Sequence, residues 1–169
     1  FVSLQTASRI DPADPNVKKM ITDTVQDRST LIDSYLAKTK AALGSMDEKT
    51  ADATREKQYG EAYANISKVL GIDPPNTAAQ GQMKIVKAEV GKLVATRMAA
   101  IQKFIAAAKF TDARTQLTAL SDLNRKTGNS YDADVRGSTY ALNFTWAKAL
   151  FSQKDYTNAD AKTDAALAV

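Results

Sequence analysis

The fold is decided by residues 83–105, MKIVKAEVGKLVATRMAAIQKFI. Apolar residues in this stretch recur mostly at steps of three and four: Met83, Val86, Val90, Leu93, Val94, Met98, Ile101 and Ile105. Because an α-helix has about 3.6 residues per turn, these side chains share one face, and the stretch predicts a long amphipathic helix. Nowhere in the sequence do apolar and polar residues alternate in the sustained way that a half-buried β-strand requires.

The composition extends this prediction to the whole chain of 169 residues. Alanine, a strong helix former, occurs 29 times, whereas the chain has only 7 glycines and 4 prolines. The sequence therefore predicts an all-α protein, and 169 residues are enough to bury the core of one domain.

The few helix breakers indicate where helices begin and end. Asp14-Pro15 predicts a cap and a first-turn proline, and Gly44 predicts a C-terminal stop. Ser45 with Glu48 resembles a capping box. Gly71 with Pro74-Pro75 closes a helix, Asn76 or Thr77 caps the next, and residues 128–130 form a loop. These signals predict helices near 2–8, 15–43, 46–57, 60–70, 77–108, 112–126, 131–153 and 158–168.

Two short patterns recur along the chain. Ile-Asp-Pro occurs at residues 10–12 and 72–74, each time before a further proline and an asparagine. An aromatic residue followed three positions later by alanine occurs at Tyr59-Gly60-Glu61-Ala62, Phe110-Thr111-Asp112-Ala113 and Tyr156-Thr157-Asn158-Ala159. In each copy we expect the aromatic to fill the turn between two antiparallel helices and the alanine to let them approach closely.

On these residues the chain resembles the tetratricopeptide repeat family, in which each repeat is a helix A, a turn and a helix B. The best match consists of Trp146, Ala147, Leu150, Tyr156, Ala159 and Ala166. The resemblance implies one domain over residues 1–169, a right-handed solenoid of antiparallel hairpins near 15–71, 77–126 and 131–169. The copies are 51 and 46 residues apart instead of the family's roughly 34, so the repeats are divergent and longer than usual. A plain helical bundle is the alternative fold. Because both ends of the chain resemble parts of a helix B, we expect it to be a piece of a longer array.

The resemblance also implies where a partner would bind. Members of this family commonly hold peptides in the groove lined by their A helices. The corresponding positions here are Met98, Gln102, Phe144, Lys148 and Ser152. Ordinary core packing is the alternative role for Met98 and Phe144.

The positive charge is concentrated in residues 84–114, which hold seven Lys or Arg against Glu89 and Asp112. The formal charge of the whole chain is only +4. Five of the basic residues are candidates for contact with an anionic polymer or surface: Lys84, Lys87, Lys92, Arg97 and Lys103. They step around the helix instead of lining one face, and few aromatic residues lie near them, which disfavours nucleic-acid binding.

The residue types argue against catalysis. The chain has no cysteine and no histidine, so the usual thiolate nucleophile, general base and zinc ligands are absent. The acidic pairs Asp47-Glu48 and Asp132/Asp134 stand at predicted helix starts, where the helix dipole favours them. We expect no catalytic residue, no metal site and no cofactor. The longest stretch without a charged residue is the eleven residues 137–147, whereas a membrane span needs about 20, so no span is expected.

These observations predict a non-catalytic module that binds a peptide or a partner protein in the A-helix groove. One alternative is a structural spacer or assembly subunit of a cell-envelope complex, and another is anionic-polymer binding through residues 84–114. Self-association, or contact with neighbouring repeats of a parent chain, fits the same architecture. The lack of cysteine is compatible with the cytoplasm and with the periplasm or cell envelope, so the sequence favours neither.

Overall fold

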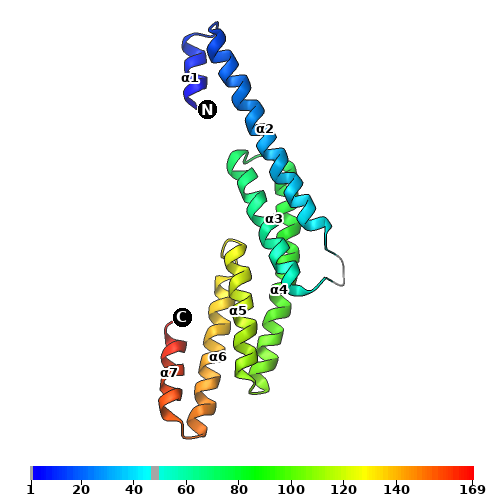
Figure 1. Cartoon of the computed structure of the whole chain (residues 1–169). Coiled ribbons are helices and arrows are strands. Elements are labelled where there is room, and N and C mark those ends of the chain that lie inside the picture. Colours follow the sequence, from blue (N-terminus) through cyan, green and yellow to red (C-terminus); the bar gives the residue numbers. More distant parts are fainter. Residues whose placement is uncertain (1, 47–49) are drawn as a thin grey trace.

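A computed structural model describes residues 2–46 and 50–169 (Figure 1). Most of the described residues are helical and no strand occurs among them, which confirms the all-α class. The helices in these ranges are α1 (Val2–Ile10), α2 (Pro15–Gly44), α3 (Asp52–Ile72), α4 (Thr77–Ala106), α5 (Phe110–Lys126), α6 (Asp132–Ser152) and α7 (Tyr156–Leu167).

Several helix ends lie where the sequence predicted them. The Asp14 carboxylate accepts hydrogen bonds from the backbone N–H groups of Asn16, at 2.7 Å, and Val17, and Pro15 opens α2. The Asn76 side chain caps α4 by accepting from the N–H of Ala79 at 3.0 Å. Such caps satisfy N–H groups that the first helical turn leaves without a partner. The predicted capping box of Ser45 and Glu48 cannot be judged, since Glu48 lies outside the described residues.

One predicted helix boundary is wrong. The sequence predicted two helices, 46–57 and 60–70, but α3 is continuous from Asp52 to Ile72. Gly60 does not break the helix. Its lack of a side chain lets α5 approach α3 closely, since a Cβ atom at Gly60 would lie 3.0 Å from the Cβ of Lys126 at the end of α5. Tyr59 is therefore a buried mid-helix residue and does not fill a turn.

The other two copies of the aromatic-and-alanine pattern stand at turns. Phe110 and Tyr156 are the first residues of α5 and α7 and follow short connections. The alanine of each of the three copies is buried: Ala62, Ala113 and Ala159. Small residues at these positions let neighbouring helix backbones lie close together, as the pattern predicted.

The helices pack mainly against their neighbours in the sequence (Figure 1). The most extensive contacts join α2 with α3, α4 with α5, and α6 with α7. Contacts of α3 with α4 and of α5 with α6 link these hairpins, and α3 also meets α5 as α4 meets α6. Fully buried apolar residues from four of the helices form the core: Ile66, Val69, Val86, Val90, Ile101, Leu120, Leu123 and Leu142.

This arrangement makes the molecule elongated (Figure 1). Its accessible surface is 10515 Å². A compact monomer of 18.2 kDa would expose about 8,100 Å². The excess surface arises because the hairpins follow one another in a row instead of gathering around one central core.

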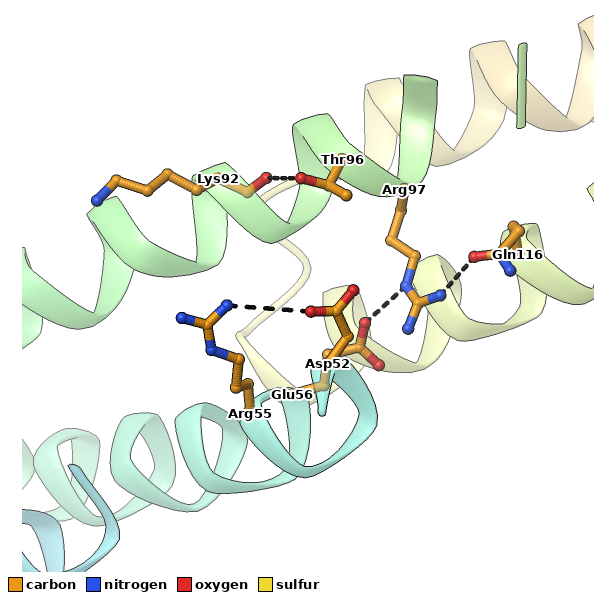
Figure 2. Close-up of polar contacts among 7 residues, drawn as sticks. All are labelled: Asp52, Arg55, Glu56, Lys92, Thr96, Arg97 and Gln116. Carbon is orange, nitrogen blue, oxygen red and sulfur yellow. Dashed lines mark hydrogen bonds and ion pairs between the residues drawn. The ribbon is translucent and has the colours of Figure 1, made fainter. Parts of the chain in front are cut away.

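A buried ion pair connects three of the helices (Figure 2). The Arg97 guanidinium on α4 donates to the Glu56 carboxylate on α3 at 2.7 Å and also to the side-chain oxygen of Gln116 on α5. The two charged side chains are only 15% and 10% exposed. This pair fixes the position of α4 between α3 and α5.

Candidate interaction surface

A cleft of about 830 Å³ lies between α6 and α7. Three of the five residues predicted to contact a partner line it: Phe144, Lys148 and Ser152. They are spaced by four residues along α6, so they follow one face of the helix. Residues of α7 form the opposite wall.

Aromatic rings dominate the walls of this α6–α7 cleft. Phe144, Phe151 and Tyr156 are 44%, 63% and 56% exposed, which is unusual for three aromatic side chains around one hollow. Phe151 meets Tyr156 edge to face with ring centroids 5.2 Å apart, so the two rings hold each other in position. The buried alanines Ala147 and Ala159 leave room between the helices.

The cleft also carries charge. The Lys148 ammonium nitrogen lies 5.7 Å from the centre of the Phe144 ring, and Asp160 lines the opposite wall on α7. A cation over an aromatic face is attracted to its π-electrons, which holds the ammonium at the cleft. The site therefore offers apolar surface together with one ammonium group on α6 and one carboxylate on α7.

The remaining two predicted partner residues lie elsewhere. Met98 and Gln102 line a crevice of about 190 Å³ between α4 and α6, together with Ile101 and Ile105. Met98 is half-buried and packs against the core, which is the alternative role that the sequence analysis gave for it. Phe144, for which the same alternative was open, is exposed at the cleft. The structure thus divides the predicted groove into the α4–α6 crevice and the α6–α7 cleft.

Sequence reasoning did not assign Phe151 and Tyr156 to the site. Phe151 follows Phe144 by seven residues, two helical turns, so helical spacing alone could have placed it on the same face. The repeated pattern predicts that Tyr156 fills a turn. It opens α7 after the turn, but more than half of its surface is exposed.

The basic residues of α4 do not form one surface. Arg97 is turned inward to Glu56, whereas Lys84, Lys87, Lys92 and Lys103 are exposed. Lys92 pairs with Glu89 at 2.5 Å. The exposed lysines span 19 residues, or about 28 Å of helix, which exceeds the screening length of about 8 Å at physiological salt. The four lysines therefore do not gather into one compact cationic patch.

Asp132, one of the two acidic residues at the start of α6, has a structural role. The Asp132 carboxylate accepts from the side-chain nitrogen of Asn124 at 2.6 Å, while the Asn124 oxygen accepts from the backbone N–H of Tyr131 at 2.8 Å. These bonds fix the connection from α5 to α6. Within residues 2–46 and 50–169, no group of three or more acidic, histidine or cysteine residues is placed to hold a metal ion.

No helix in the described ranges combines the length and apolar character that crossing a membrane requires. Comparison of the chain with protein-family models, with curated proteins and with solved structures gave no match.

Proposed function

We propose that the chain is a non-catalytic interaction module, a divergent right-handed solenoid of tetratricopeptide-like hairpins that binds a partner protein or peptide. The observation that carries the proposal is the α6–α7 cleft, with its three exposed aromatic rings and one lysine. Large exposed apolar patches on a water-soluble surface mark sites of interaction. The sequential packing of hairpins and the buried alanines of the repeated pattern support the solenoid.

Burial of the aromatic side chains would supply most of the affinity. Fully covering one such side chain contributes about 1.5–3 kcal/mol, and aromatic residues are frequent among the few that dominate binding energies. Lys148 would favour partners with a carboxylate and speed their encounter more than it would strengthen the complex.

A structural spacer in a cell-envelope assembly is the second candidate. Its support is the elongated row of hairpins, whose surface exceeds that of a compact monomer. The third candidate, binding of an anionic polymer or surface through residues 84–114, has less support because Arg97 is paired inside the protein and the exposed lysines are dispersed.

Affinity capture from a lysate of the source organism tests the first candidate. The baits are the native chain, a Phe144→Ala/Lys148→Glu variant, and a Lys84→Glu control that carries the same charge reversal away from the cleft. We expect one discrete protein to remain on the native and control baits at moderate salt and to be lost from the cleft variant. Equal retention by all three baits contradicts the cleft as the site.

The salt dependence separates the alternatives. Binding that is strong at low salt, falls steeply as salt is added and is weakened by Lys84→Glu indicates the anionic partner. If no bait retains a protein at either salt concentration, the spacer is favoured.

A further inference from the structure

The α4–α5 and α6–α7 hairpins correspond to each other with an offset of 46 residues, the separation of Phe110 from Tyr156. The α4 side of the narrow crevice consists of four residues: Met98, Ile101, Gln102 and Ile105. Adding 46 to these numbers gives four residues that all line the open cleft: Phe144, Ala147, Lys148 and Phe151. The cleft is therefore the second copy of a surface that occurs once already in the molecule.

In the first copy this surface is covered by a helix. Helix α6 lies against it with small residues one helical turn apart, at Ala133, Gly137 and Ala141. Trp146 of α6 also stacks on Phe110 of α5, with ring centroids 5.4 Å apart. The counterpart of Phe110 is Tyr156, which is 56% exposed and contacts only the equally exposed Phe151 among the described aromatic rings.

The covering helix runs in the same direction as α4. At the start of α6, the Tyr131 hydroxyl lies 3.4 Å from the carbonyl oxygen of Lys87. Further along, residues 133–141 of α6 line the crevice with residues 98–105 of α4. Because later residues of one helix meet later residues of the other, the two helices are parallel, as Figure 1 shows.

We propose that the α6–α7 cleft binds an α-helix of a partner protein, parallel to α6, as α6 itself is bound by α4 and α5. This inference rests on the proposed function and specifies the partner as a preformed or induced helix, not an extended peptide. The helix carries small residues at the positions of Ala133, Gly137 and Ala141, which let it approach the rings of Phe144 and Phe151.

One difference between the two copies specifies the partner further. Asp134 of α6 lines the crevice together with Gln102, and the counterpart of Gln102 in the cleft is Lys148. A carboxylate at the position of Asp134 in the incoming helix would therefore face an ammonium group instead of an amide. Charge-assisted contacts of this kind are stronger than neutral ones. The partner helix consequently has an acidic residue directly after its first small residue.

The probe for the experiment is the stretch of this chain that covers the first copy, residues 130–145, SYDADVRGSTYALNFT. It is added as a peptide with blocked ends to the isotope-labelled full chain, and binding is followed by amide chemical shifts up to about 1 mM peptide, so that even Kd values in the millimolar range are detected. We expect saturable shifts confined to residues 144–163. Phe151→Ala should weaken binding, whereas the control Lys84→Glu should leave the Kd unchanged.

A charge exchange tests the register. Lys148→Glu in the protein, or Asp134→Lys in the peptide, should each raise the Kd by about fivefold, the effect of one partly exposed ion pair. Combining the two should restore the Kd to within about twofold of the native pair, since the salt bridge is re-formed with its charges reversed.

Three outcomes overturn the proposal. The first is the absence of chemical-shift changes at 1 mM peptide, and the second is changes at residues 98–105, which would show that the peptide replaces α6. The third is that the increases in Kd caused by Lys148→Glu and Asp134→Lys add when the two are combined, instead of cancelling. Each is distinguishable from a failure of the proposed function. If the lysate experiment yields a partner that depends on Phe144 and Lys148 while the peptide does not bind, the cleft is the site but its ligand is not this kind of helix.

Discussion

The role of Arg97 in the structure differs from the one that the sequence suggests. In the sequence Arg97 is one of several basic residues along α4, yet its guanidinium is largely buried against Glu56 and Gln116 (Figure 2). Two charges taken out of water are costly unless they are paired, so the contact specifies how α3, α4 and α5 meet.

We expect Glu56→Ala to lower the free energy of unfolding by about 3 kcal/mol, because it leaves the buried Arg97 charge without its carboxylate. The matched control is Lys92→Ala, which removes an exposed ion pair with Glu89 and should cost less than about 1 kcal/mol. Urea unfolding followed by circular dichroism measures both. Equal losses in the two variants would show that the buried pair has no special role.

Gly128, in the connection between α5 and α6, occupies a position that a residue with a side chain would strain. Its backbone has φ of +74°, and a Cβ atom there would lie 2.6 Å from the hydroxyl oxygen of Tyr63 on α3. Gly128→Ala should therefore lower the midpoint of thermal unfolding, with a loss of about 1–2 kcal/mol. The control is Gly137→Ala in the interior of α6, where a Cβ meets nothing within 4 Å. This control should raise stability by about 0.5–1 kcal/mol, and destabilisation of the same size in both variants would contradict the argument.

At the scale of the helix, the two ends of α2 differ in how much they pack against other helices. The Arg28 guanidinium donates to the carbonyl oxygen of Ile72, the last residue of α3, at 2.5 Å. The residues of α2 before this point extend beyond α3, and α1 is the described helix that lies beside them (Figure 1). Thr39 is the one buried residue of α2, and α1 has none. The first half of α2 thus lacks the apolar contacts that stabilise most helices in proteins.

We expect the amide hydrogens of residues 18–27 to exchange with solvent through local opening, at least about a hundredfold faster than those in the middle of α4. Asp14→Ala should accelerate this exchange further, because it removes the cap of α2, while exchange in α4 stays unchanged. Hydrogen exchange followed by mass spectrometry makes the measurement. Equal protection of both segments would mean that α2 opens only when the whole chain unfolds.

At the scale of the whole molecule, helix α4 joins the two halves of the chain. It packs on α3 and also on α5 and α6, and its 30 residues extend over about 45 Å. The α2–α3 hairpin and the α6–α7 hairpin consequently lie toward opposite ends of the row (Figure 1).

Small-angle X-ray scattering should therefore give a radius of gyration well above about 15 Å, the value for a compact domain of 169 residues. The distance distribution should have the long tail of a rod. A radius near 15 Å would indicate that the hairpins fold back on one another in solution. Measurement over a range of concentrations provides the control for self-association.

The helical class and most helix ends can be predicted from the sequence. These features depend on contacts within a few residues, such as the Asp14 cap of α2, the Asn76 cap of α4 and the spacing of apolar residues in α4. The resemblance to the tetratricopeptide repeat family also pointed to three residues that line the cleft: Phe144, Lys148 and Ser152.

The continuity of α3, the inward position of Arg97 and the separation of the predicted groove into a crevice and a cleft follow from tertiary packing. Each depends on residues far apart in the sequence: Lys126 of α5 packs close to Gly60 in the interior of α3, and Arg97 pairs with Glu56, which lies 41 positions earlier. The cleft is open because, in the described chain, no helix covers α6 and α7 as α6 covers α4 and α5. Local patterns determine how a segment folds, whereas packing between segments determines which of its faces remain free to bind.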